Sequence, residues 1–237
     1  MYKRQGLDWL TDIGISIVNP VPSLFTFNMP DEPIQDLMGI VVEDAGVRVH
    51  GTKIKTDGPL LFTHWGMSGP AVLKASSIGA RWMQEKAYQF HISVHWIQSL
   101  TDENLRQELN TIQREHGSKL VKNYRPAALP IRLWHYLLEK IEVPDSFRWR
   151  DIDKKWTHKL IGILTNDQYG IRGKTTFKEE FVTAGGVCLS AIAPQTLASL
   201  KHPNLYFAGE ILDIDGITGG FNFQAAWTTA YVAAQLA

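Results

Sequence analysis

The sequence predicts an α/β protein, or α+β if the chain is considered by itself, and three observations support this fold class. Residues 23–96 consist mostly of short apolar or alternating runs, which favour strands. Residues 99–166 change to the spacing of amphipathic helices. Residues 204–237 combine a short apolar run, a glycine-rich loop and an alanine-rich helical segment. With 237 residues, 44% of them hydrophobic, the chain can bury one large core or two smaller ones.

The overall composition limits the classes of partner. Lysine and arginine number 24, as do aspartate and glutamate, so the formal net charge is zero and we expect neither a nucleic-acid nor a membrane partner. The single cysteine excludes an internal disulfide, and a cytoplasmic location is expected. His91 and His95 have the spacing of a zinc-binding helix, but they lie in a predicted strand, so no metal is expected. The sequence does not predict an oligomeric state.

The N-terminal part is predicted to form the end of a helix followed by a strand. Residues 1–5 resemble a translated sequencing-adapter scar and are left out of the fold prediction. Residues 6–14 predict the end of a helix with Gly14 as its C-cap. Residues 15–18 predict a short strand, and the two prolines of residues 19–22 predict a stiff exit from it.

The strand-rich part is expected to contain four strand segments and the start of a helix. Strands are predicted over residues 24–28, over residues 39–50 as a hairpin turning at 44–46, and over 59–63. Ser68 and Pro70 predict the start of a helix, with Ser68 as its N-cap. Residues 89–96 alternate between polar and apolar side chains and predict a half-buried strand.

Three helices are predicted in residues 99–166. The first starts at Thr101 with acidic residues in its first turn, the second covers residues 130–141 and the third covers 156–164. Beyond them, residues 175–177 and 181–182 predict further strand.

The last stretch predicts a ligand site. Residues 205–208 form an apolar run that suits a buried strand, residues 209–220 form a loop with four glycines and three acids, and residues 221–236 favour a helix. Unpaired amides at the helix start carry partial positive charge, and adjacent glycines let a flat ligand approach the backbone. The carboxylates of the loop can accept hydrogen bonds from the hydroxyl groups of a sugar or polyol. A ligand with an electron-rich ring edge and a polyhydroxy chain, such as a flavin, fits this description.

This stretch resembles a known family. The segment LYFAGEILDIDGITGGFNFQAA is similar to the C-terminal flavin segment of the BaiN/YhiN-like flavoproteins, which are NAD(P)/FAD-dependent oxidoreductases also called the aminoacetone-oxidase family. THWGMSGPAVLKAS at residues 63–76 and VTAGGV at residues 182–187 resemble two further segments of the same family. The resemblance covers residues 6–237.

The resemblance implies an FAD-dependent oxidoreductase whose flavin carries hydride transfer to or from a small organic substrate. The implied fold is a remnant of a discontinuous Rossmann-like FAD domain with an inserted strand-rich, barrel-like domain and a small helical insertion. In order, the implied parts are the scar (1–5), an FAD-domain remnant (6–19), the strand-rich domain (20–98), the helical insertion (99–166), the strand-rich return (167–193) and the C-terminal FAD-domain segment (194–237).

The resemblance also implies which residues hold the flavin. They are Thr183, Ala184, Gly185, Gly186, Gly209, Glu210, Asp213, Gly216, Gly219, Gly220, Phe221 and Asn222. His64 is a candidate for the substrate side of the flavin, with a hydrogen-bonded structural histidine as the equal alternative. The substrate, the direction of the reaction and the use of NAD(P) stay open.

One element of an FAD site is not found in the sequence. A dinucleotide site requires G-x-G-x-x-G after a first strand, and the family places this motif upstream of Gly6. The adenosine and pyrophosphate half of the site is therefore expected to lie outside this chain. We expect the chain alone to bind FAD weakly or not at all, and to be inactive by itself.

Two other readings remain. The strand-rich part could be a non-enzymatic binding module in which the glycine-rich loop is only a structural turn. A serine hydrolase using Ser68 and His64 is disfavoured because Pro70 replaces the final glycine of G-x-S-x-G.

Overall fold

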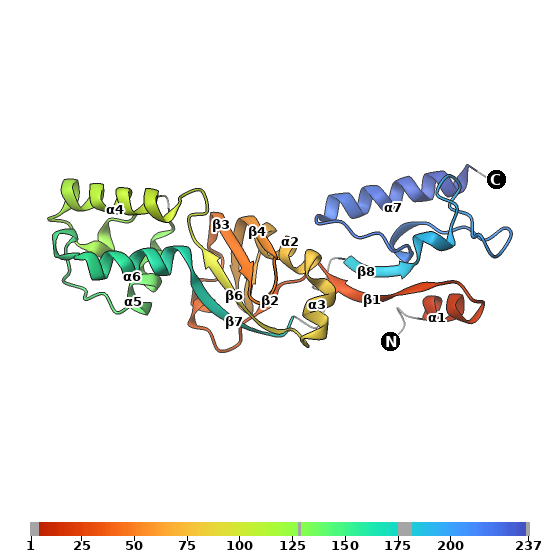
Figure 1. Ribbon diagram of the computed structural model, residues 1–237, viewed down its shortest axis with the longest axis horizontal. Coiled ribbons are helices and arrows are strands. Elements are labelled where there is room, and N and C mark those ends of the chain that lie inside the picture. The colour runs from red at the N-terminus through yellow and green to blue at the C-terminus, as the bar shows by residue number, and fades with distance from the viewer. Residues whose placement is uncertain (1–4, 128, 175–181, 236–237) are drawn as a thin grey trace. The chain divides into compact units, whose positions relative to one another are not determined.

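The computed structural model describes residues 5–127, 129–174 and 182–235, and it divides the chain into two compact units. Unit 1 comprises residues 1–25, 76–85 and 175–237, and unit 2 comprises residues 26–75 and 86–174. Figure 1 shows the elements of both units. Each unit is described here by itself. None of the helices in the described ranges is long and apolar enough to cross a membrane.

Unit 2 contains a six-stranded antiparallel sheet that is nearly closed into a barrel. Its strands follow the order β2-β5-β4-β3-β6-β7. The amide of Asn28, at the end of β2, donates to the carbonyl of Gly173, just beyond β7, at 3.1 Å and so brings the two edge strands together. The strands are β2 (Phe27–Asn28), β3 (Val41–Val49), β4 (Lys55–Thr63), β5 (Gly66–Ser68), β6 (Gln89–His95) and β7 (Asp167–Arg172).

Large side chains fill the interior of this sheet. Phe62, Trp96 and Tyr169 are fully buried, and the Trp96 ring lies 5.7 Å from the Phe62 ring and 6.3 Å from the Tyr169 ring, centroid to centroid. β6 buries Phe90, Ile92 and Val94 and exposes His91, as its alternating sequence predicts, but Ser93 on the polar side is also buried. The prediction of a mixed α/β protein with a strand-rich, barrel-like part is confirmed.

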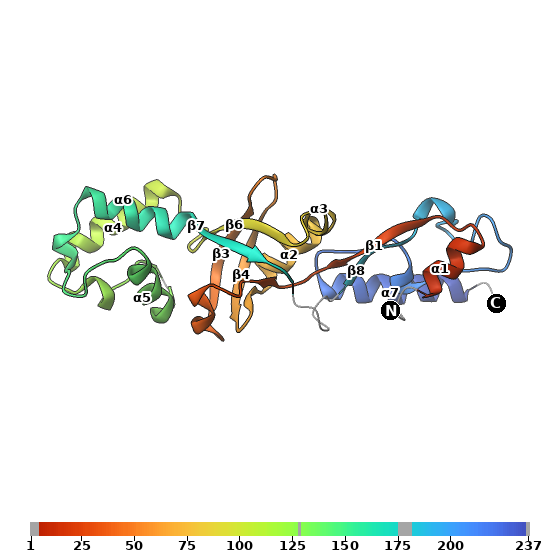
Figure 2. The ribbon, with the colours of Figure 1, turned by 90° about the horizontal axis from the view of Figure 1, so that it is seen from below.

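The helical part of unit 2 forms as predicted. Its helices are α4 (Asp102–His116), α5 (Ile131–Lys140) and α6 (Lys154–Thr165), and Figure 2 shows them beside one another from a second direction. Thr101 caps α4 by accepting a hydrogen bond from the amide of Asn104, and Asp153 caps α6 in the same way through Trp156. Short 3₁₀ turns, η2 (Pro33–Leu37), η3 (Val121–Asn123) and η4 (Trp149–Asp151), connect the regular elements.

Unit 1 is built around a two-stranded ribbon. β1 (Ile17–Ser23) pairs antiparallel with β8 (Val182–Val187), and a small core gathers around Ile15, Val187 and Leu212. The unit also contains α1 (Gln5–Asp12), α3 (Ala80–Glu85), η5 (Leu189–Ala191), η6 (Gly209–Ile211) and α7 (Gly219–Ala234), while α2 (Pro70–Ile78) has residues in both units. Gly14 ends α1 with a φ of +78°, as expected of a C-cap.

Five local predictions are wrong. The expected strand over residues 24–28 is interrupted by Leu24 at a φ of +53°, so only β2 remains of it. β1 instead runs through the two prolines, because β1 has a single neighbouring strand among the described residues and tolerates lost amide donors on its other side. Residues 44–46 form a bulge inside β3, and the chain turns only at residues 50–54.

The fourth error concerns Ser68, which ends β5, so that Gly69 rather than Ser68 precedes α2. The fifth concerns residues 205–208. They form a single bridge between Ala198 and Tyr206 rather than a strand, and residues 197–199 are their bridge partners within the described part of the chain. The strand predicted at 175–177, and residue 181 of the one predicted at 181–182, lie outside the described residues.

Candidate functional site

The candidate site in unit 1 is the start of α7 and the loop before it. Thr218 caps the helix, because its hydroxyl oxygen accepts a hydrogen bond from the amide of Phe221 at 3.3 Å. Gly219 and Gly220 occupy the first two helical positions, where backbone amides have no partner within the helix. The helix is 16 residues long, so its dipole adds partial positive charge at this end.

Two side chains of α7 hold the loop in place. The Asn222 side-chain oxygen accepts from the amide of Gly216 at 3.0 Å, and its nitrogen donates to the carbonyls of Gly216 and Thr218 at 3.0 and 2.8 Å. The Thr229 hydroxyl accepts from the amide of Gly209 at 2.9 Å. The loop is therefore fixed to the helix at both of its ends.

The glycines of the site differ in what surrounds them. A side chain added at Gly209, Gly219 or Gly220 would meet nothing within 4 Å, although the φ of +78° at Gly209 favours glycine there, and a Cβ at Gly216 would lie 2.0 Å from the Phe221 ring. A Cβ at Gly185 would lie 2.7 Å from the carbonyl oxygen of Asn19, and one at Gly186 would lie 2.3 Å from that of Ile211. Packing inside unit 1 therefore explains the glycines at positions 185 and 186. At Gly219 and Gly220, φ is negative and no neighbouring atom within the chain requires a glycine.

The acids of the loop are held by neighbours from distant parts of the sequence. Glu210 accepts from the backbone amide of Thr183 at 2.9 Å, and Asp213 lies 3.8 Å from the guanidinium of Arg81. The Ser23 hydroxyl donates to Asp215 at 3.4 Å, and burial raises the pKa of the Asp215 carboxyl above its usual range. Arg81 and Ser23 were not predicted, because no sequence signal places α3 or β1 beside this loop.

A pocket of about 200 Å³ opens between the loop and α7. Its lining comprises Val182, Gly209, Glu210, Ile214, Gly219, Asn222, Phe223, Ala225 and Ala226. Four of these were predicted as cofactor-binding residues, namely Gly209, Glu210, Gly219 and Asn222. Apolar side chains at Ile214, Phe223 and the two alanines, with one carboxylate and the helix amides, suit a flat ligand that carries polar groups at its edge.

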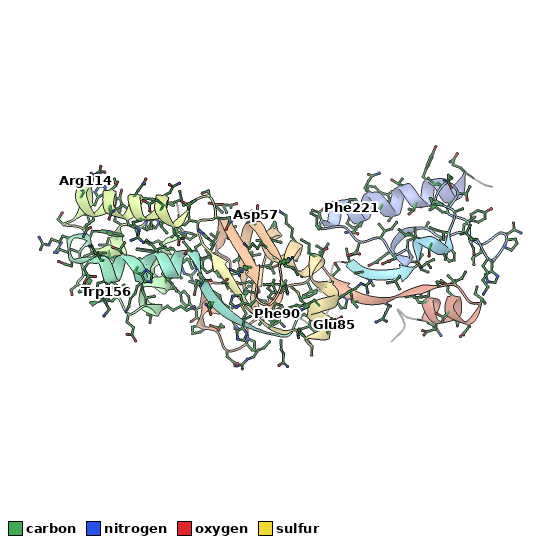
Figure 3. The ribbon with its side chains drawn as sticks, in the orientation of Figure 1. Asp57, Glu85, Phe90, Arg114, Trp156 and Phe221 are labelled. Atoms are coloured by element: carbon green, nitrogen blue, oxygen red, sulfur yellow. The ribbon has the colours of Figure 1, made fainter. Side chains whose placement is uncertain are left out.

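The remaining predicted site residues of unit 1 lie around the pocket without lining it. Thr183, Ala184, Gly185 and Gly186 belong to β8, Asp213 and Gly216 belong to the loop, and Gly220 and Phe221 belong to the first turn of α7. Phe221 is 55% exposed, and Figure 3 shows it at the start of α7.

His64 and Ser68 belong to unit 2 and do not form a nucleophile–base pair. His64 is exposed in the turn between β4 and β5, where its ring lies 3.5 Å from the ring of Trp65, centroid to centroid. Ser68 is buried in β5, and among the described residues it has no hydrogen bond to His64. This geometry does not support the hydrolase reading.

Comparison with known proteins identifies the family. Residues 21–182 match the family described as "HI0933-like protein barrel and H2TH domain", which agrees with the near-closed sheet and helices of unit 2. Among the similar proteins are two named ribosomal RNA dihydrouridine synthase. The one from Escherichia coli strain K12 is 33% identical over 89% of this chain and 50% of its own length, and the one from Haemophilus influenzae strain Rd is 30% identical over 97% and 54%.

A third relative is the 3-dehydro-bile acid delta(4,6)-reductase of Clostridium scindens, which is 25% identical over 98% of this chain and 57% of its own length. The chain thus spans about half the length of the relatives it matches. All three relatives are enzymes. Because the family match covers most of the sequence, the chain belongs to the family of HI0933-like proteins.

Proposed function

We propose that this chain is part of an FAD-dependent oxidoreductase that reduces a carbon–carbon double bond conjugated to a carbonyl group. The observation that carries the proposal is the pocket at the start of α7, with open glycines and unpaired helix amides on one side and apolar side chains on the other. Unit 1 is assembled from three separate stretches of sequence, which agrees with a discontinuous Rossmann-like FAD domain.

The residues present fit part of a flavin. The open space at Gly219 and Gly220 leaves room for the edge of a planar ring beside the helix amides. Ile214 and the two alanines of α7 offer an apolar surface for the ring, and Glu210 offers a carboxylate for ribityl hydroxyl groups. The adenosine and pyrophosphate half of FAD has no predicted partner in this chain. Flavin, when bound, supplies hydride transfer.

The chain's own contribution is to position the ring and to bias its charge. The α7 dipole and the amides of Gly219 and Gly220 favour negative charge at the ring edge that they face. Asn222 keeps the loop in the conformation that leaves these amides open. Asn222 is therefore a positioning residue rather than one that reacts.

The names of the relatives indicate the reaction class. Dihydrouridine is uridine whose C5–C6 double bond has been saturated, and that bond is conjugated to the C4 carbonyl. A delta(4,6)-reductase acting on a 3-oxo compound reduces a bond of the same kind. At the double bond next to the carbonyl, the substrate gains a hydride at the β carbon and a proton at the α carbon. We favour uridine in ribosomal RNA as the substrate, because two of the relatives with at least 30% identity carry that name.

Flavin binding is tested first by spectroscopy. The Escherichia coli relative, as purified, is expected to show the flavin double band between about 350 and 500 nm, whereas this chain retains little or none. A spectrum without flavin bands in the relative would overturn the proposal.

The placement of the flavin is tested with Gly219→Val in this chain, because Gly219 lines the pocket. The added side chain projects into open space, so the fold stays intact while the approach to the helix amides is blocked. Titration with riboflavin, followed by flavin fluorescence, should show weak binding that Gly219→Val reduces at least tenfold. Gly162→Val is the matched control, because Gly162 lies in open space on α6. Equal binding by both variants refutes the placement.

The reaction class is tested with the Escherichia coli relative after anaerobic reduction of its flavin. Mixing with ribosomal RNA from a strain lacking the enzyme should return the flavin to its oxidised spectrum and form dihydrouridine, because the uracil ring accepts two electrons. The oxidised enzyme should not be bleached by primary amines such as aminoacetone. Bleaching by amines without reoxidation by RNA would instead favour amine oxidation.

A further inference from the structure

We propose that the helical part of unit 2 carries a docking surface for RNA, formed by Arg114, Lys119, Arg150, Lys154 and Lys155. We call this set the basic surface. The inference deepens the proposed function, on which it rests, because it states where an RNA substrate is held outside the flavin pocket. The charge, the backbone contacts and the exposure of these five residues support it.

Positive charge is concentrated in two short stretches. Residues 114–125 and 147–155 hold eight of the chain's 24 lysines and arginines but only three of its 24 acidic residues. The neutral total of the whole chain conceals this local excess. The expectation that the protein has no nucleic-acid partner depended on that total, and the proposal departs from it.

The fold brings these two stretches together. Leu120 and Arg148 form an antiparallel bridge. The amide of Trp149 donates to the carbonyl of Lys119, and the amide of Arg150 donates to that of Gly117, both at 3.0 Å. Cations that are about 30 residues apart in sequence therefore lie on adjoining backbone segments.

The start of α6 joins the same region. The Gln113 side chain, at the end of α4, donates to the carbonyl of Ile152 at 2.6 Å. This contact brings residue 152, and with it Lys154 and Lys155 in the first turn of α6, to the end of α4 that carries Arg114. Figure 3 shows Arg114 on α4 and Trp156 on α6 in this part of the molecule.

The cations of the basic surface are exposed, and two of the nearby acids are engaged with the backbone. Lys119, Lys154 and Lys155 are exposed, and within the described residues their ammonium groups make no hydrogen bond or ion pair. Asp151 accepts from the amide of Arg148 at 2.8 Å, and Asp153 accepts from that of Trp156 at 2.9 Å. The second oxygen of Asp151 lies 3.8 Å from the Arg150 guanidinium, an exposed pair that offsets part of the charge of that arginine.

Aromatic rings lie among the cations. The half-buried His116 and Tyr124 rings are tilted against each other with centroids 4.0 Å apart, and the Lys159 ammonium lies 4.4 Å from the centre of the half-buried Trp156 ring. Lysine and arginine bind phosphates, and the parts of such rings that reach the surface can stack on unpaired bases. This combination, and the ribosomal RNA substrate named for two relatives, favour RNA over an acidic protein as the partner.

The test reverses three charges of the surface. The variant Lys119→Glu, Lys154→Glu, Lys155→Glu is compared with the unmodified 237-residue chain in filter binding to refolded Escherichia coli ribosomal RNA. We expect at least a tenfold loss of affinity. The slope of log Kd against log salt should fall by about three, since each lost phosphate contact removes roughly one.

The matched control is Arg48→Glu, Lys53→Glu, Lys55→Glu, which reverses the same number of exposed charges around the β3–β4 turn. It should bind RNA within about threefold of the unmodified chain. Glutamate is favourable in the first turn of α6, and circular dichroism melts of both variants establish that they fold. Equal losses in the two variants, or unchanged binding by the first, would overturn the docking surface.

The outcome separates this inference from the proposed function. If the unmodified chain binds no RNA while the flavin tests succeed, the docking surface is refuted and the flavoenzyme proposal stands. If RNA binds through the basic surface but neither this chain nor the Escherichia coli relative contains flavin, the flavoenzyme proposal fails. The proposed docking surface for RNA then still stands.

Discussion

At the scale of single residues, Asp167 is the most constrained polar group in unit 2. Its side chain is 1% exposed and accepts from the Lys140 ammonium at 2.6 Å and from the Trp96 indole at 3.0 Å. It also accepts from the Tyr169 hydroxyl. These contacts connect α5 with β6, β7 and the residue after β6. A buried charge with this many partners is costly to break, because removing one partner leaves the others unsatisfied.

The pH dependence of stability should reveal this carboxyl. Burial raises the pKa of Asp167 above its usual value, and the contacts with Lys140, Tyr169 and Trp96 oppose that rise. A raised folded-state pKa contributes stability that is fully present below the ordinary carboxyl pKa of about 3.9 and is lost as pH rises through the folded value. We expect the free energy of unfolding of the wild type minus that of Asp167→Asn to decrease from pH 4 to pH 7.

Urea unfolding of both proteins at each pH measures this difference, and most of the other carboxyls cancel in the subtraction. A difference that grows with pH would mean that the ion pair with Lys140 outweighs the cost of burial, contrary to the expectation.

Some residue-scale signals in the sequence were reliable because they are local. Thr101 and Gly14 take their expected positions at helix ends, since capping depends on a few neighbouring residues, whereas Ser68 ends a strand instead of capping α2. Arg81 and Ser23 could not be predicted beside Asp213 and Asp215. Those contacts join positions more than 130 residues apart, and only the folded chain brings them together.

At the scale of elements, the β1–β8 ribbon explains the adjacent glycines of the VTAGGV segment. Gly185 and Gly186 have φ values of +105° and +138°, which side chains rarely adopt, and both pack against backbone. The sequence predicts that these glycines approach a ligand. The structure gives them an internal reason, which leaves the open glycines of α7 as the stronger evidence for a ligand.

Gly186→Ala should therefore destabilise the fold. Its Cβ would lie 2.3 Å from the carbonyl oxygen of Ile211, and backbone cannot yield as a flexible side chain can. We expect a loss of about 2–4 kcal/mol in the free energy of unfolding, measured with urea and far-UV circular dichroism.

Gly219→Ala is the matched control for this change. It meets nothing within 4 Å and should leave stability unchanged or slightly higher, because alanine favours helix more than glycine does. Equal stability of the two variants would contradict the packing role of Gly186.

At the scale of the whole molecule, the two units differ in how completely they cover their apolar surface. Unit 2 buries the large aromatic side chains Trp96, Trp134 and Trp149. In unit 1, α7 has no buried residue in its described span, and Phe223, Trp227 and Tyr231 are each at least 65% exposed. α7 therefore presents an apolar surface that the described residues of unit 1 leave uncovered.

The sequence by itself determined the three helices of residues 99–166, the strand β6 and the glycine-rich loop followed by a helix, because caps, periodicity and turn residues act over a few positions. Only the tertiary structure decided which glycines are explained by packing, which acids meet Arg81 and Ser23, and which cations form the basic surface. Those features depend on backbone pairings such as Leu120 with Arg148 and Val18 with Gly186, and pairing between distant segments is set by the packing of the whole unit rather than by local preference.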